Sequence, residues 1–169
     1  MSLRAAIALT LFLTLPATAS TSAPGTPPLT PVTPTSAVTT WGDTAIFIDP
    51  VGEQERYRPF GRPDIVILTQ PHPDHLSIST MIGMLRRDTI VLAPQTVIDE
   101  LPLMISNNVI TPFEPGSVQV VEGITFTAAP NCTGETTLTG VTLEIANTRA
   151  HIALSTTGTP HLSAQPTVC

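Results

Sequence analysis

The sequence predicts a layered α/β or α+β domain, and three observations favour this class. A hairpin pattern opens the folded part, a strand–helix–strand–helix pattern fills the middle, and a run of strands follows. The chain has 169 residues, of which 41% are hydrophobic and 12% are charged. This is enough to bury the core of one domain, and the apolar content excludes a wholly disordered chain.

The charge balance argues against nucleic acids and anionic membranes as partners. Seven basic residues, all of them Arg, stand against 13 Asp and Glu, for a net charge of -6. An acidic chain without a basic cluster offers no electrostatic footprint for a polyanion. The two Cys residues allow one disulfide or none.

The first 19 residues have the pattern of an export signal. Arg4 precedes an apolar run over residues 5–15, Pro16 then breaks the helix, and small residues follow at 17–19. The alternative is a membrane anchor, but at about 1.5 Å per residue this run spans roughly half of a hydrocarbon core. The pattern therefore predicts a signal peptide cleaved near Ala19, a secreted or periplasmic protein, and no membrane attachment after cleavage.

A Pro/Thr-rich linker is expected over residues 20–36, which include five Pro. It is expected to be solvated and partly extended, with residues 29–32 able to join a sheet edge. The folded domain is then expected over residues 37–169.

The first half of this domain alternates strands and helices. Residues 38–41 and 44–48 predict a hairpin around Gly42-Asp43. The continuous apolar run at 65–68 is typical of a strand buried on both faces. Residues 77–87 predict an amphipathic helix whose apolar face carries Ile78, Met81, Ile82 and Leu85. A strand at 89–93 and a short helix at 95–101 follow, and then strands at 109–113, 118–121, 124–128, 141–146 and 151–155.

The chemically informative segment is Thr-Gln-Pro-His-Pro-Asp-His-Leu-Ser, residues 69–77. It lies between a buried strand and a helix, where α/β proteins place their ligands. His72, Asp74 and His75 supply imidazole and carboxylate groups, which suit Zn²⁺ and similar ions. The alternative is a proline-stiffened helix entry in which Asp74 caps the helix and both His side chains are exposed.

This loop resembles the His-x-His-x-Asp-His signature of the metallo-β-lactamase superfamily, in members akin to ascorbate-phosphate lactonases. The resemblance implies a layered αββα sandwich, incomplete at the carboxyl end, and it runs from about Val38 to Thr159. Its further landmarks are residues 41–51, 89–94, 114–117, 128–131 and 151–158.

Several of that family's metal ligands are absent. Gln70 stands at the position of the first His, and residues 131–135, where the family's next ligand His would follow, contain no His. The bridging Asp of the family falls on Thr156 or Thr157, and the last ligand His would lie beyond residue 169. Three ligands remain in register, namely His72, Asp74 and His75, so the resemblance implies at most one Zn²⁺ or a weakly held one.

Other candidate ligands are weaker. The resemblance leaves Cys132 or His161 as a third ligand of a single-zinc site. The alternatives are a Cys132–Cys169 disulfide and a surface position for His161. His151 is expected to be a cross-strand or exposed side chain.

The resemblance implies hydrolysis of an ester, lactone, amide or phosphoester in a small-molecule substrate. A metal-activated water would be the nucleophile, and Asp74, as the catalytic residue, would orient it. The missing ligands leave open a second hypothesis, a degenerate, non-catalytic binding protein of the same fold. An uncovered sheet edge or apolar face at an incomplete carboxyl end would favour self-association.

Overall fold

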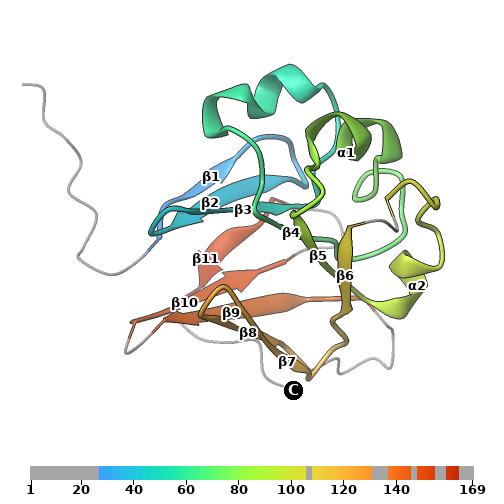
Figure 1. Cartoon of the computed structure of the whole chain (residues 1–169). Helices are drawn as coiled ribbons and strands as arrows, with labels where there is room; N and C mark the ends of the chain where they lie inside the picture. The colour runs from blue at the N-terminus through green and yellow to red at the C-terminus, as the bar shows by residue number, and fades with distance from the viewer. Residues whose placement is uncertain (1–26, 106–107, 131–136, 146–147, 155–158, 164–169) are drawn as a thin grey trace, which may run out of the picture.

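The computed structural model of the chain describes residues 27–105, 108–130, 137–145, 148–154 and 159–163. These residues form three layers: a helical layer, a six-stranded sheet and a five-stranded sheet, in that order (Figure 1). The expected mixed α/β class with stacked layers is confirmed.

The first sheet combines antiparallel and parallel pairing in the order β1-β2-β3-β4-β5-β6. The pairs from β1 to β3 are antiparallel, and those from β3 to β6 are parallel. The expected hairpin is confirmed as β2 and β3, with Gly42 at φ 60° in its turn. The strands are β1 (Leu29–Pro31), β2 (Ala37–Trp41), β3 (Thr44–Ile48), β4 (Ile65–Ile67), β5 (Ile90–Ala93) and β6 (Val109–Pro112).

Strand β4 is buried on both faces, as its continuous apolar sequence predicts. Ile65 and Ile67 belong to the core between the two sheets. Val66 and Leu68 belong to the core under the helices. Successive side chains of a strand point to opposite faces, so a sheet covered on both sides needs such an unbroken run.

The helical layer contains a 3₁₀ helix η1 (Gln54–Phe60), α1 (Ile78–Met84) and α2 (Gln95–Ile98). The sequence gives no periodic signal for η1, and it was not expected. Helix α1 is shorter than the predicted 77–87, because Ser77 caps its start and Leu85 is already extended. The short helix α2 also ends before the predicted residue 101.

The prediction that Ile82 lies on the buried apolar face of α1 is wrong. Ile82 is 49% exposed, whereas Thr80 and Met84 are buried beside Met81. Next to Ile82, Gly83 lies against η1: a Cβ placed on Gly83 would lie 1.9 Å from the side chain of Gln54. The side of α1 that carries Thr80 and Met84 is therefore the buried one, and Ile82 faces solvent.

Tyr57 fastens η1 to the first sheet. Its ring stacks on Phe47 with centroids 5.6 Å apart. Its hydroxyl donates to the Val51 carbonyl at 2.8 Å and accepts the Val51 N–H at 3.0 Å. The segment after β3 is therefore tied to η1 at both backbone groups of one residue.

Replacing Tyr57 with Phe should lower the free energy of unfolding by about 1 kcal/mol, because the ring stays and only the hydroxyl bonds are lost. Tyr57→Ala should cost about 3–5 kcal/mol, since it also removes the buried ring. Urea denaturation measures both. Equal losses for the two variants would contradict the structure, in which ring and hydroxyl have separate partners.

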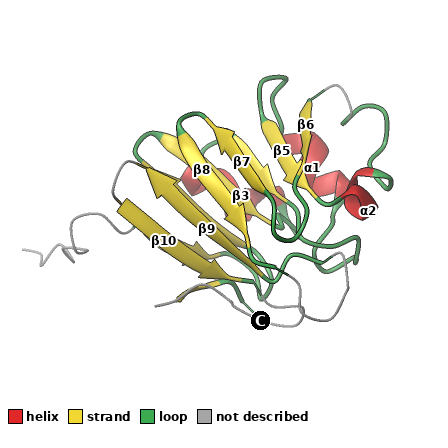
Figure 2. Cartoon of the chain, turned by 90° about the horizontal axis from the view of Figure 1, so that it is seen from below, coloured by secondary structure: helices red, strands yellow, loops and turns green. Residues whose placement is uncertain are grey.

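The second sheet is antiparallel throughout, in the order β11-β10-β9-β8-β7. The expected strand at 151–155 begins earlier, as β10, and β11 was not expected. Figure 2 shows β8, β9 and β10 facing the viewer with no helix in front, so the described residues lack the outer helical layer of an αββα sandwich. The strands are β7 (Val118–Val121), β8 (Ile124–Ala128), β9 (Gly140–Ile145), β10 (Thr148–Ala153) and β11 (His161–Ser163).

The segment before β2 belongs to the fold rather than to a solvated linker. Strand β1 pairs with β2, so the expected sheet-edge position of residues 29–32 is confirmed. Thr35 and Ser36 are buried. The end of the expected 20–36 linker is therefore corrected, because its last residues pack and form hydrogen bonds. Within the described ranges, no helix has the length and apolarity to cross a membrane.

Candidate functional site

The loop at residues 69–77 turns tightly at the carboxyl end of β4. The carbonyl of His72 accepts the N–H groups of His75 and Leu76, both at 2.8 Å. This turn lets His72, Asp74 and His75 converge although they are close in sequence. The expected position of the loop, between a buried strand and α1, is confirmed.

His75 is the most buried of the three candidate ligands. Only 1% of the residue is exposed. Its Nδ1 lies 2.7 Å from Oδ2 of Asp49, and its Nε2 lies 3.8 Å from Oδ1 of Asp74. A carboxylate on Nδ1 favours the tautomer with the proton there, so Nε2, facing Asp74, keeps its lone pair.

Asp49 is the site residue that sequence reasoning missed. It follows β3 with φ 43° and accepts the Thr69 N–H at 2.8 Å and the Thr69 hydroxyl at 2.6 Å. Burial raises the pKa of the Asp49 carboxyl, while the hydrogen bonds from His75 and Thr69 lower it. The available signal is an Asp-Pro pair directly after a buried strand.

His72 and Asp74 lie on the exposed side of the loop. Nδ1 of His72 hydrogen-bonds Oδ1 of Asp74. This bond is the main cause that holds the pKa of Asp74 below its usual range. The carboxylate of Asp74 thus lies between two imidazoles, and the three predicted site residues are brought together.

Two adjacent hydroxyls, those of Thr35 and Ser36 just before β2, form hydrogen bonds to the backbone of this site. Thr35 donates to the backbone carbonyl of Asp74 at 2.5 Å. Ser36 donates to the backbone carbonyl of Asp49 at 2.5 Å. Both residues are buried, so the segment fixes the spacing between the loop carboxylate and the carboxylate that orients His75.

The donor set fits one cation in part. Zinc bonds to nitrogen and oxygen are about 2.0–2.2 Å long, so one ion can bridge Nε2 of His75 and Oδ1 of Asp74 at 3.8 Å. Nδ1 of His72 is turned to Asp74 instead. In the part of the chain that the structure describes, no three His, Cys, Asp or Glu side chains are grouped to hold a metal.

The other candidate ligands do not join this group. His161 is exposed in β11, with Nδ1 3.4 Å from the Thr159 carbonyl. His151 pairs across β9 and β10 with Thr142, whose hydroxyl lies 2.8 Å from Nδ1, as a cross-strand position predicts. The remaining expected positions, Cys132, Cys169, Thr156 and Thr157, lie outside the described residues.

Comparison with known proteins places the chain by its fold. No protein-family model and no curated protein matches the sequence. A protein assigned as a metal-dependent hydrolase from Parabacteroides distasonis superposes with a TM-score of 0.59 and 22% identity, over 74% of this chain and 59% of its own. Igni18, a metallo hydrolase from the archaeon Ignicoccus hospitalis KIN4/I, superposes with a TM-score of 0.59 and 16% identity. The match covers 76% of this chain and 60% of Igni18.

A more distant function occurs on the same fold. CmlA, a diiron β-hydroxylase from Streptomyces venezuelae, superposes with a TM-score of 0.53 and 16% identity over 76% of this chain and 29% of its own. The chain has the metallo-β-lactamase fold, as its loop and landmarks predict. It spans about three fifths of the length of the two hydrolases.

Proposed function

We propose that this chain is a metal-dependent hydrolase of the metallo-β-lactamase fold that holds a single divalent cation, Zn²⁺ by its donor chemistry, between Asp74 and His75. The observation that carries the proposal is the chain of contacts Asp49–His75–Asp74. A buried carboxylate on the far nitrogen of a His ring is the usual support of a metal-ligating His. The similar hydrolases support the same class of activity.

A cation bound there would supply a water of lowered pKa, the nucleophile for an ester, lactone, amide or phosphoester. Asp74 lies at the exposed side of the pair and is placed to orient that water. His75 is held by Asp49 and stays in one orientation. The substrate proposed for this chemistry is a small molecule, which would arrive from the solvent side, where His72 and Asp74 are exposed.

A second candidate function, a non-catalytic binding protein, is supported by the contact between His72 and Asp74. This contact occupies both groups with one another. Gln70 stands where the family's signature has its first His, so this position adds no further imidazole. Two donors hold a cation weakly, so binding without turnover is the competing outcome.

Export is part of the proposal. The support is the sequence of residues 1–19, with Arg4, its apolar run and its small residues before Ala19. The mature protein would then act in a secreted or periplasmic setting.

Metal content decides between the two candidate functions. The purified mature protein, incubated with Zn²⁺ and dialysed, is expected to retain close to one equivalent by elemental analysis. It should hydrolyse at least one ester, lactone or phosphoester substrate of a panel, and chelation should stop the reaction. Retained metal without hydrolysis supports the non-catalytic binding protein. No retained metal contradicts the hydrolase and leaves the non-catalytic protein.

The hydroxyl of Thr35 provides a test of the site that leaves every ligand in place. Thr35→Val keeps the shape of the side chain and removes the bond to the Asp74 carbonyl. Zn²⁺ affinity in calorimetric titration should fall about 10-fold or more, the scale seen when groups that support metal ligands are lost.

Thr40→Val is the matched control, because Thr40 is exposed on β2 and its neighbours are not site residues. It should leave the affinity unchanged. Equal affinities for Thr35→Val and Thr40→Val would show that the segment before β2 does not position the loop.

A further inference from the structure

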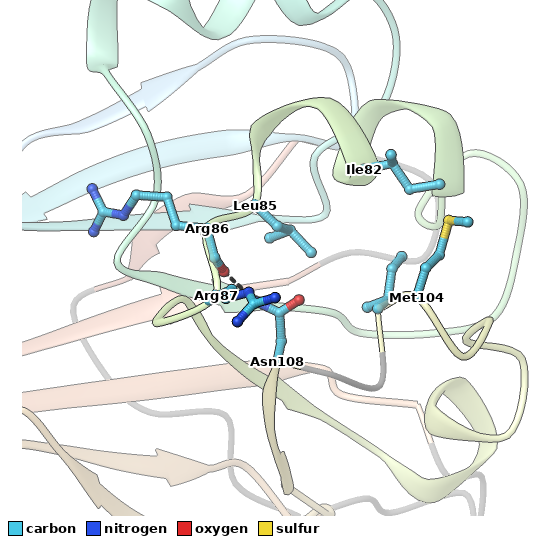
Figure 3. A pocket seen from close by; sticks show the side chains of 7 residues that line it. Ile82, Leu85, Arg86, Arg87, Met104 and Asn108 are labelled. Atoms are coloured by element: carbon cyan, nitrogen blue, oxygen red, sulfur yellow. Dashed lines mark hydrogen bonds between the residues drawn. The ribbon is translucent and has the colours of Figure 1, made fainter.

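A pocket of about 420 Å³ lies at the end of the first sheet that is opposite to the loop at residues 69–77 (Figure 3). The loop 69–77 follows the carboxyl end of β4, whereas this pocket is formed where the chain enters β5 and β6. Its walls come from α1, from the turn at Arg86 and Arg87, and from residues 104–105 and 108. Its volume is in the range of about 300–1,000 Å³ that small organic ligands occupy.

One wall of the pocket is apolar and open to solvent. Ile82 is 49% exposed and Met104 is 62% exposed, and both line the pocket with Leu85. Leu103, next to it in the chain, is 87% exposed. Gathered apolar side chains at a concave surface favour a ligand with an apolar part over an inorganic ion.

The two arginines of the pocket differ in whether a carboxylate pairs with them. The guanidinium of Arg86 is held by Asp64 at 2.6 Å and by Asp88 at 3.1 Å. Figure 3 shows it extending away from Ile82 and Met104. Arg87 also lines the pocket and is exposed, and no carboxylate within the described ranges forms an ion pair with it.

Asn108 makes the polar side of the pocket rigid. Its amide nitrogen donates to the carbonyl of Arg86, drawn as the dashed line in Figure 3, and to the carbonyl of Thr89 at 3.3 Å. Both acceptors flank Arg87 in the turn that leads into β5. The backbone that carries Arg87 is therefore held in place although its guanidinium is open to solvent.

We propose that this pocket binds a small amphipathic carboxylate, a medium-chain fatty acid or a compound of that shape. The guanidinium of Arg87 would take the carboxylate, a pairing that planar, two-pronged donors favour. The apolar tail would lie along Ile82 and Met104 and cover them from water. One open cation suits a monoanion, and the apolar side chains beside it favour a ligand with an apolar tail.

Calorimetric titration with hexanoate, octanoate and decanoate, below their micelle concentrations, tests this proposal. Saturable one-to-one binding is expected, and the affinity should rise about threefold for each added methylene that becomes buried. Octanol should bind at least 10-fold more weakly than octanoate, because it lacks the charge. Absence of saturation, or equal affinities across the series, would overturn the proposal.

Two variants locate the site. Arg87→Gln should weaken octanoate binding about 10-fold or more, and Met104→Ser should weaken decanoate more than hexanoate. Arg56→Gln, an exposed Arg of η1, is the matched control and should have no effect. Equal effects of Arg87→Gln and Arg56→Gln would show that octanoate is attracted by the charge of the protein in general, which would contradict a specific site at Arg87.

A membrane surface is the other partner that exposed apolar and basic side chains could serve. Vesicles of neutral lipid with one fifth anionic lipid provide that arm of the experiment. The proposal requires that octanoate binds and that vesicles do not co-sediment with the protein. Co-sedimentation that depends on Arg87, without octanoate binding, would overturn it in favour of membrane contact.

Discussion

Asp49→Ala should be among the most destabilising single changes in this protein, with a loss of about 3–5 kcal/mol in the free energy of unfolding. Asp49 is 1% exposed, and its carboxylate accepts three hydrogen bonds, two from Thr69 and one from the ring of His75. Removing it leaves buried donors without acceptors, each at a cost of about 1–3 kcal/mol. Ala at φ 43° adds backbone strain of about 1 kcal/mol. Urea denaturation measures the loss.

Two controls separate these causes. Asp49→Asn keeps one acceptor oxygen and tolerates the left-handed backbone, so it should cost clearly less than Asp49→Ala. Asp43→Ala removes an exposed carboxylate in the hairpin turn and should stay within about 0.5 kcal/mol of the parent. If Asp49→Ala is no less stable than Asp43→Ala, the described network does not hold the loop.

Asp74→Ala should weaken Zn²⁺ binding by about 100-fold or more, below detection by calorimetry if the parent site is weak. Loss of a group that merely supports a ligand costs about 10–100-fold, and this change removes a ligand itself. It also removes the anionic donor of the loop and leaves a doubly charged ion facing imidazoles alone. Because Asp74 is exposed, the variant should keep the stability of the parent, so the loss can be assigned to the site.

Gln70→His should have the opposite effect and tighten Zn²⁺ binding modestly, by adding an imidazole beside the existing pair. Asp99→Ala removes an exposed carboxylate at the end of α2, and this control variant should bind Zn²⁺ as the parent does. If neither Asp74→Ala nor Gln70→His differs from the parent, the loop is a proline-stiffened helix entry and the likeness to metal-dependent hydrolases is one of fold alone.

The sequence predicts the elements with strong local signals. The hairpin β2–β3 has apolar residues on both sides of a Gly-Asp turn, and β4 lies in a run of four branched apolar residues at 65–68, so both could be predicted. Helix η1 has no such signal, because its sequence carries Pro59 and two Arg and is held mainly by the ring and hydroxyl of Tyr57. Strand β11 is three residues long and exists by pairing with β10.

By itself, the sequence determined the layered class, the metallo-β-lactamase loop and the identity of its three polar residues, His72, Asp74 and His75. These are local properties: hydrophobic period, turn chemistry and donor type. The tertiary structure alone decided that Asp49, 26 residues before His75, fixes the ring of that His, and that Thr35 and Ser36 hold both carboxylate residues. Such contacts arise when parallel strands bring their carboxyl ends to one edge, and no local pattern encodes which distant side chains meet there.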